Sequence, residues 1–280
     1  MNKGDEVVKW LQEKNILLLN PQLVEQSYED WMKDQQGMSG GMFGQSIVTP
    51  ELDGGIHPYA VAAQYKNEQG YHTYKPIPGR IEKFCETTER WLSLKKKPNS
   101  EKKLCIYYYK GAGKNGIVAG GLEVGSSLFS LLTKLKNEGY TTGQLPETTE
   151  ALLQKIQKEG PLLGDYAQGT LQEFLKEGSP ALISVNEYEA WCKSELDPES
   201  YKEVIKQYGP APGKYLTTSV NDTLYLAIPR VRFGNICLLP LLPAALGENE
   251  FKMTHGVKQA PPHAYIASYL WSRMAFKTDV

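Results

Sequence analysis

Residues 104–139 constrain the fold more than any other stretch of the chain. Residues 104–109 are a run of β-forming side chains, a glycine-rich turn follows, and residues 118–138 carry apolar side chains at helical spacing up to Gly139. A strand, a tight turn and a helix in this order form half of a βαβ unit, whose crossover is right-handed. The pattern predicts an α/β protein with Rossmann-like parallel-sheet layers.

A charged segment near residue 100 predicts a division of the chain. Residues 95–101 contain three consecutive lysines and a helix-stopping proline, and they separate a long predicted helix from the strand at 104. We expect an α/β segment over residues 1–100 and a Rossmann-like α/β domain over residues 101–280. Helical patterns interrupted by Gly and Pro place a helical insertion at about 147–208 within the second part.

The first part begins with a helix and a buried strand at residues 16–19, which ends at Asn20-Pro21. A parallel strand needs a partner, and no upstream segment supplies one, so we expect an internal segment of a longer protein. Residues 37–44 are too rich in glycine for a helix interior and predict a loop, followed by a short strand at 47–48. A hairpin at residues 58–74 and a helix at 78–97 complete this part.

Charge and apolar content exclude several classes of function. The 31 Lys and Arg residues balance 32 Asp and Glu residues, and they form no basic cluster of the kind that nucleic acid requires. The longest apolar stretches fall short of the roughly 20 residues that span a bilayer. The first residues also lack the apolar core of a secretory signal. We therefore expect a cytoplasmic protein with no transmembrane segment and no nucleic-acid partner.

The four cysteines stand singly in the sequence. No pair has the C-x-x-C spacing of a zinc site, so buried thiols are the favoured interpretation. The four histidines show no i, i+4 pairing, which argues against a dedicated metal site. The cysteines are Cys85, Cys105, Cys192 and Cys237.

A glycine motif follows the strand at 104–109. Gly111, Gly113 and Gly116 match G-x-G-x-x-G, whose backbone N–H groups can bind a phosphate. A dinucleotide site also needs an acidic residue at the end of the next strand, and residues 140–145 contain none. The motif is therefore either an anion-binding turn or a tight turn that needs small residues.

Two histidines and two carboxylates lie on turns and could carry chemistry. His255 and His263 are on a Gly/Pro-rich segment ahead of a predicted helix, where His263 could instead serve as a cap. Glu51 and Asp53 flank one leucine, and they either share a site as acid and base or are solvated turn residues.

Two further groups suit a ligand. Arg230 and Arg232 are at strand spacing, which puts both guanidinium groups on one side of a sheet and fits a carboxylated ligand; a pair of surface arginines is the alternative. Met38, Met42 and Phe43 form a soft apolar flap that either covers a flat hydrophobic ligand or packs as a hinge.

Residues 31–41 contain Gly37-Met38-Ser39-Gly40-Gly41, and residues 45–56 contain Pro50-Glu51-Leu52-Asp53-Gly54-Gly55. These two blocks resemble the large, tetrapyrrole-binding subunit of cobaltochelatase and magnesium chelatase, the CobN/BchH-type family. The remaining blocks follow in the order of the family and cover most of the chain. They are residues 80–81, 97–103, 107–116, 145–147, 232–235 and 261–267.

This resemblance implies an internal segment of a larger multidomain subunit that binds a porphyrin or corrin. The family inserts Co²⁺ or Mg²⁺ as substrate metal, as in cobalamin or chlorophyll biosynthesis, and separate AAA+ partner subunits hydrolyse ATP. The enzyme class is a metal chelatase, a ligase. A histidine- and glycine-rich block is expected beyond Val280, so the isolated segment is expected to hold an incomplete active site. Two alternatives remain: a haem-handling relative that removes iron, and a non-catalytic tetrapyrrole-binding or scaffold domain.

The chemistry of insertion assigns roles to the candidate residues. Two pyrrole N–H protons leave as the metal enters, so a His or carboxylate near the ring would act as base and as transient metal ligand. In the family context the glycine turn is not a dinucleotide site. The catalytic candidates are His255, His263, Glu51 and Asp53, with transient metal binding at either histidine. The ring-binding candidates are Arg230, Arg232, Asn235 and the amides of Gly111, Gly113 and Gly116 at its polar edge, with Met38, Met42 and Phe43 on its face.

Overall fold

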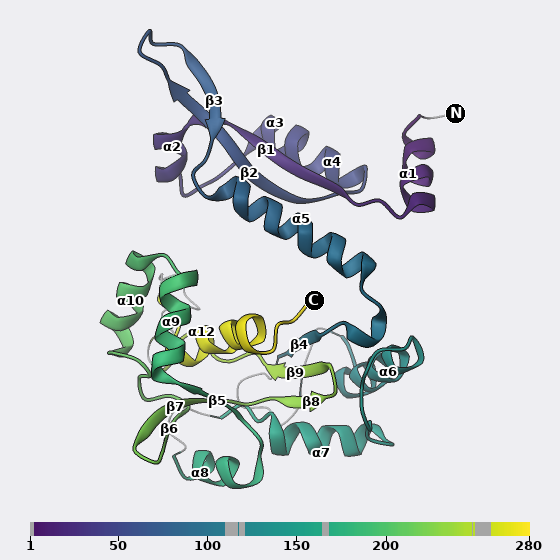
Figure 1. The fold of residues 1–280 in the computed structure, drawn as a ribbon, viewed down its shortest axis with the longest axis vertical. Helices are drawn as coiled ribbons and strands as arrows, with labels where there is room; N and C mark the ends of the chain where they lie inside the picture. The colour runs from purple at the N-terminus through teal and green to yellow at the C-terminus, as the bar shows by residue number, and fades with distance from the viewer. Residues whose placement is uncertain (1–2, 110–116, 118–120, 164–167, 248, 250–258) are drawn as a thin grey trace. The chain divides into compact units, whose positions relative to one another are not determined.

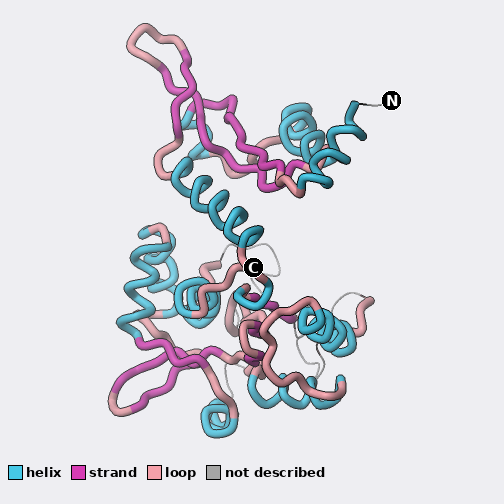
Figure 2. Tube along the Cα trace, turned by 45° about the vertical axis from the view of Figure 1, so that its right-hand side comes forward, coloured by secondary structure: helices cyan, strands magenta, loops and turns pink. Residues whose placement is uncertain are grey.

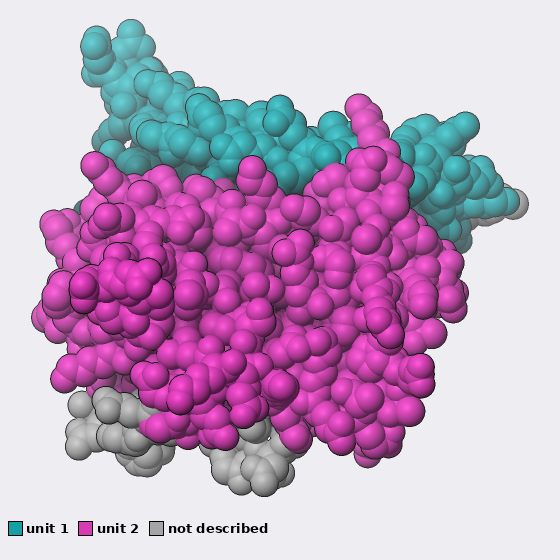
Figure 3. Space-filling model, turned by 60° about the horizontal axis from the view of Figure 1, so that its bottom comes forward, with its two compact units in different colours: residues 1–95 teal, residues 96–280 magenta. Residues whose placement is uncertain are grey.

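The computed structural model describes residues 3–109, 117, 121–163, 168–247, 249 and 259–280. The chain forms two compact units, Met1–Lys95 and Lys96–Val280, which are coloured separately in Figure 3. Within the described ranges, none of the helices combines the length and the apolar character that crossing a bilayer requires.

The first unit is built on a three-stranded sheet in the order β1-β2-β3 (Figure 1). Strand β1 (Leu18–Ser27) runs parallel to β2 (Gly55–Lys66), and β3 (His72–Pro76) is antiparallel to β2. The predicted hairpin is thereby confirmed. The prediction that the first strand ends at Asn20-Pro21 is wrong, because β1 accommodates the proline at an irregularity of its register.

Three separate helices and one helical run accompany this sheet in the described part of the unit. The first, α1 (Lys3–Lys14), precedes β1, and α2 (Tyr28–Lys33) follows it directly. Ser27 caps α2 by accepting a hydrogen bond from the Asp30 N–H. The long α5 (Arg80–Lys96) follows β3, as the sequence predicts. The helical run is formed by the glycine-rich segment and the residues after it.

Residues 40–52 form a helical run, so the predicted loop over 37–44 is right only for residues 37–39, and the short strand at 47–48 is wrong. The run consists of α3 (Gly40–Phe43), a π-helical turn η1 (Gly44–Val48) and α4 (Thr49–Leu52). The Ser46 carbonyl in η1 accepts hydrogen bonds from the side chains of Asn20 at 2.9 Å and Gln22 at 3.0 Å, both on β1. These tertiary contacts outweigh the low helix propensity of glycine.

The second unit contains two three-stranded sheets. In the first, β4 (Leu104–Tyr108) is parallel to β9 (Ile236–Pro240), and β8 (Val231–Phe233) is antiparallel to β9. The predicted core strand over 231–239 is therefore a hairpin, which turns at Gly234 with a φ of 54°. The α/β class is confirmed, with each parallel strand pair lying beside an antiparallel strand.

The other sheet is antiparallel in the order β5-β7-β6, made of β5 (Ala181–Ser184), β6 (Thr217–Val220) and β7 (Thr223–Ile228). The β6-β7 turn is at Asn221-Asp222, where the sequence predicts a hairpin, and both residues have positive φ. Strand β5 is a correction, because it lies inside the stretch expected to be wholly helical. It pairs with β7, a partner distant in sequence that local patterns do not reveal.

Helices lie on both sides of these sheets (Figure 2). The helix after β4 is confirmed as α6 (Val124–Asn137), starting later than predicted. The stretch 147–208 contains the four expected helices. The remaining elements are α7 (Thr149–Glu159), α8 (Gln168–Glu177), α9 (Val185–Glu195), α10 (Pro198–Tyr208), α12 (His263–Leu270), and the short turns η2 (Asn99–Glu101) and η3 (Trp271–Ala275).

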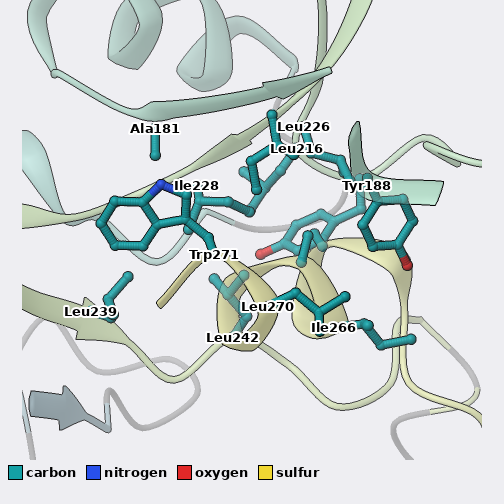
Figure 4. Close-up of a cluster of buried hydrophobic side chains, with 14 of the residues drawn as sticks. Ala181, Tyr188, Leu216, Leu226, Ile228, Leu239, Leu242, Ile266, Leu270 and Trp271 are labelled. Carbon is teal, nitrogen blue, oxygen red and sulfur yellow. The ribbon is translucent and has the colours of Figure 1, made fainter. Parts of the chain in front are cut away.

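The β4-β9-β8 sheet separates two hydrophobic clusters, and alternate side chains enter each. Ile106 and Leu238 pack with α6 and α7. Cys105 and Cys237 belong to the larger cluster, which also contains Trp271. Figure 4 shows this cluster, in which side chains of β7 meet those of α12 and η3.

Candidate functional site

The first unit contains a cavity of about 620 Å³ into which the predicted flap residues point. Met38, Met42 and Phe43 all line it, so the structure brings together the three residues that the sequence predicts for a flat apolar ligand. The other apolar lining residues are Val24, Trp31, Ile47, Pro58 and Ala60.

The helical run over residues 40–52 carries Met42, Phe43 and Ile47, whereas Met38 lies in the segment that precedes α3. Ile47 follows Met42 by five residues. Because a π-helical turn has i→i+5 hydrogen bonds, these two side chains lie on the same side of the run and both line the cavity. The Ser46 anchor to β1 holds this face toward the sheet.

Polar side chains complete the cavity wall, and two of them are carboxylates that the sequence analysis missed. Glu25 is exposed on β1, and Asp34 follows α2. The Asp34 carboxylate accepts hydrogen bonds from the Gln26 side chain and from the backbone N–H groups of Gln36 and Gly37. These bonds lower the pKa of Asp34 below its usual value, so the group is ionised at neutral pH.

A sequence signal exists for only part of this wall. An Asp before Gln-Gln-Gly is typical of a turn in which the side chain bonds to following N–H groups, and Asp34 makes such bonds. That signal predicts a turn and says nothing of a cavity. Glu25 follows the buried Val24 on β1. Nothing in the sequence distinguishes it from any other exposed strand residue.

The predicted pair Glu51 and Asp53 lies elsewhere on the first unit. Both side chains are exposed at the end of α4, where Asp53 is the last, capping position. Neither lines the cavity. The structure therefore does not bring these two carboxylates together with Met38, Met42 and Phe43.

In the second unit, Arg230 and Arg232 lie beside a pair of stacked aromatic rings. The Arg230 guanidinium is 5.4 Å from the Trp271 ring centre, and that of Arg232 is 5.6 Å from the Phe276 ring centre. The two rings stack at 5.5 Å. Lys103 also lies 5.6 Å from the Phe276 ring, which makes this a cluster of three cations on an aromatic base.

The two arginines differ in how far their polar atoms are satisfied. The Nε of Arg232 donates to the Gly234 carbonyl at 3.0 Å. The Nε of Arg230 is buried and has no hydrogen-bond partner among the described residues. Burial lowers the pKa of Arg230. An anionic group placed against Arg230 would satisfy this donor and offset the lost hydration.

His263 is the first residue of α12, and its ring is buried rather than acting as a side-chain cap. Its Nε2 lies 2.9 Å from the Gly209 carbonyl, which only accepts, so Nε2 carries the proton. Its Nδ1 then accepts from the Tyr188 hydroxyl at 3.0 Å. The ring also forms part of the wall of a second cavity of about 340 Å³. Burial lowers the pKa of His263, so the ring is neutral.

The remaining predicted residues divide into two groups. Asn235 uses its side-chain amide and its backbone N–H to bind the carbonyls of Ser100 and Thr141, which fixes the β8-β9 turn. His255, Gly111, Gly113 and Gly116 lie outside the described residues. Over the ranges that are described, no three His, Cys, Asp or Glu side chains are grouped so that they could hold a metal ion.

Comparisons with known proteins agree on one family. A family model described as CobN/Magnesium Chelatase matches residues 1–280. Magnesium-chelatase subunit ChlH from Oryza sativa is 26% identical over 92% of this chain and 17% of its own length. Aerobic cobaltochelatase subunit CobN from Pseudomonas aeruginosa is 22% identical over 89% of this chain and 20% of its own length.

One solved structure has the same fold. The catalytic subunit of cobaltochelatase from Mycobacterium tuberculosis matches 92% of this chain and 21% of its own with a TM-score of 0.77, at 23% identity. The chain thus spans about a fifth of the length of the relatives it matches. These comparisons give no support to the haem-handling alternative.

Proposed function

Because the chain belongs to the CobN/magnesium chelatase family, we propose that it forms part of the tetrapyrrole-binding large subunit of a metal chelatase. The whole subunit inserts Co²⁺ or Mg²⁺ into a corrin or porphyrin ring, and ATP is hydrolysed by separate AAA+ subunits. The observation that carries this proposal is the apolar cavity of the first unit, lined by the three residues that the resemblance assigns to the face of the ring.

A tetrapyrrole is flat and apolar on its faces and polar at its edge, and the cavity has matching walls. Its volume of about 620 Å³ lies within the range of small-molecule sites, roughly 300–1,000 Å³. The thioethers of Met38 and Met42 are polarisable and adapt to an aromatic face, while Trp31 supplies a rigid wall. We assign these side chains to one face of the macrocycle.

The carboxylates at the cavity wall suit the substrate metal. Oxygen ligands are those that Mg²⁺ prefers, and Mg²⁺ keeps several waters when bound. The ionised Asp34 can hold such a hydrated cation beside the ring. Glu25 is an exposed carboxylate in the same wall, and we assign it to accept a pyrrole proton.

The arginine cluster of the second unit is, taken by itself, a candidate site for carboxylate groups. Carboxylate substituents at the edge of a tetrapyrrole fit the Arg230 and Arg232 guanidinium groups. The buried unpartnered Nε of Arg230 supports this role. His263 can take part as a transient metal ligand only if its Nδ1 releases the Tyr188 hydroxyl. Glu51, Asp53 and His255 stay as candidate bases.

A binding titration of the purified chain tests the proposal. Absorbance and fluorescence are followed with protoporphyrin and with a metal-free corrin, in the parent chain and in Met42→Ala. Loss of the Met42 contact should weaken binding about tenfold, the equivalent of about 1.4 kcal/mol. Met32→Ala is the matched control, because Met32 is exposed on α2 and does not line the cavity.

The outcomes separate clearly. Saturable binding that is weakened in Met42→Ala and unchanged in Met32→Ala supports the cavity as the ring site. Binding that is equal in all three proteins would move the ring site away from the cavity. Metal insertion is then measured by adding Co²⁺ or Mg²⁺, ATP and the partner subunits to the full-length protein that carries the same substitutions. Ring binding without insertion would identify a tetrapyrrole-binding segment that has no insertion chemistry.

A further inference from the structure

Two cysteines face each other across the parallel strand pair of the second unit. Cys105 on β4 is the direct register partner of Cys237 on β9. Both side chains belong to the same hydrophobic cluster, and their thiols interact as hydrogen-bonding partners. Neighbouring strands lie about 4.8 Å apart, inside the Cα separation of roughly 4.4–6.8 Å that a disulfide spans.

Positively charged side chains lie near the pair. The positive charges of Arg230 and Arg232 act on Cys237, and Arg232 is its direct register partner on the neighbouring strand β8. Hydrogen-bond donors and nearby cations both favour the ionised sulfur.

The two thiols differ in exposure and in the direction in which their pKa values move. A hydrogen bond from the Cys237 thiol lowers the pKa of Cys105, whereas donating that bond and burial raise the pKa of Cys237. Cys237 is fully buried, and Cys105 is only partly so. Cys105 is therefore the sulfur that an oxidant meets first, and Cys237 is held beside it.

We propose that Cys105 and Cys237 form a redox-active dithiol, which a peroxide oxidises to a disulfide between β4 and β9. The Cys105 thiolate attacks one oxygen of hydrogen peroxide, and the O–O bond breaks. The products are a sulfenic acid on Cys105 and one water, because the leaving hydroxide takes up the proton that the thiol released. The Cys237 sulfur then attacks the sulfenic sulfur, and its proton leaves with the hydroxyl as a second water. Two thiols and one peroxide thus give one disulfide and two waters.

The bond so formed is reversible. The side chains of direct partners on parallel strands start about 4.8 Å apart, whereas the Cβ atoms of a disulfide average about 3.8 Å. Closing this gap strains the sheet, and strained disulfides are readily reduced by thiols. The modification would therefore respond to the ratio of oxidant to thiol, independently of ring binding in the first unit.

The other two cysteines provide internal references. Cys85 is exposed on α5, and Cys192 is buried on α9 beside Tyr188. Replacing both, as Cys85→Ser and Cys192→Ala, leaves the pair as the sole thiols of the full 280-residue chain. Circular dichroism establishes that this background folds. If it does not, peptide mapping of the parent chain reports the same linkage.

The test treats this background with hydrogen peroxide, blocks free thiols and measures the intact mass under denaturing conditions. The expected product has lost both thiols and two hydrogen atoms, contains a peptide linkage between residues 105 and 237, and regains both thiols with glutathione. In Cys237→Ser, dimedone should trap a sulfenic acid on Cys105. In Cys105→Ser, Cys237 should stay reduced.

Two results would overturn the proposal. One is that both thiols remain titratable at a peroxide concentration that oxidises Cys85 in the parent chain. The other is that the parent and Cys237→Ser give the same stable adduct on Cys105, which would show that Cys237 does not resolve the sulfenic acid.

Discussion

The Tyr188 hydroxyl donates a hydrogen bond of 3.0 Å to Nδ1 of His263, and the ring is fixed from its other side by Nε2 and the Gly209 carbonyl. This pair joins α9 to α12 through the centre of the larger cluster. A neutral histidine is required, because protonation of Nδ1 would turn the acceptor of the Tyr188 bond into a second donor.

We expect the stability of the second unit to fall as the pH is lowered through the range in which free histidine titrates. Burial lowers the pKa of His263 in the folded chain, whereas the unfolded chain titrates near 6.5. Below that pH the unfolded state binds one more proton, so stability decreases by at most about 1.4 kcal/mol per pH unit. Urea unfolding at pH 7.5 and 5.5 measures this slope, and His263→Gln should flatten it. An unchanged slope would assign the acid sensitivity to other groups.

Removing the donor of the same bond should destabilise the fold at neutral pH. Tyr188→Phe keeps the buried ring and leaves the Nδ1 acceptor of His263 unsatisfied, which costs about 1–3 kcal/mol. Urea unfolding at pH 7.5 measures the difference. Tyr225→Phe on β7 is the control, because Tyr225 is only partly buried. Equal effects of the two substitutions would contradict a specific role of the Tyr188–His263 bond.

Glycine substitutions in the run over residues 40–52 should have opposite effects. Gly44 has a helical φ of −58° and open space where a Cβ would be, so Gly44→Ala should stabilise the run by about 0.5–1 kcal/mol. Gly40 has a φ of +60°, which an alanine adopts poorly. Hydrogen exchange of peptides from residues 40–52 should slow in Gly44→Ala and accelerate in Gly40→Ala. The reverse order would argue against a helix here.

This glycine-rich run shows where sequence patterns stop being informative. Strand β4, helix α6 and the β2-β3 hairpin follow from local periodicity and turn residues, and the sequence predicts them. The helical run depends on bonds from Asn20 and Gln22 to Ser46, and β5 depends on its pairing with β7. Contacts between residues so distant in the chain leave no local pattern.

The residues of the candidate site also divide into those with a local sequence signal and those that only the fold brings together. Met38, Met42 and Phe43 lie in one short segment, and their residue types sufficed to propose an apolar face. Glu25 and Asp34 reach the same cavity from β1 and from the end of α2, so only the fold relates them to it.

We expect Asp34 to contribute to binding of the metal and little to binding of the ring. Asp34→Asn removes the charge of a carboxylate that lines the cavity and keeps an acceptor for the Gln36 and Gly37 N–H groups. We expect porphyrin binding without metal to stay within about twofold of the parent, and the change in porphyrin fluorescence on adding Co²⁺ to be lost. Glu29→Gln, an exposed carboxylate on α2 outside the cavity, is the control. A Co²⁺ response that persists in Asp34→Asn would exclude Asp34 as a metal contact.

Arg230 should stabilise a ligand more than it stabilises the fold. Its guanidinium is desolvated and its Nε is unpartnered, so Arg230→Met, which keeps the aliphatic contact with Trp271, should leave the thermal midpoint unchanged or raise it. The same substitution should weaken binding of a porphyrin with several carboxylates about tenfold, and that of a porphyrin with alkyl substituents only slightly. A buried cation lowers the stability of the folded state. We therefore expect such a residue where the protein binds an anion. If Arg230→Met lowers the midpoint strongly and binds both porphyrins as the parent does, the arginine is a packing residue against Trp271 and the carboxylate contact lies elsewhere.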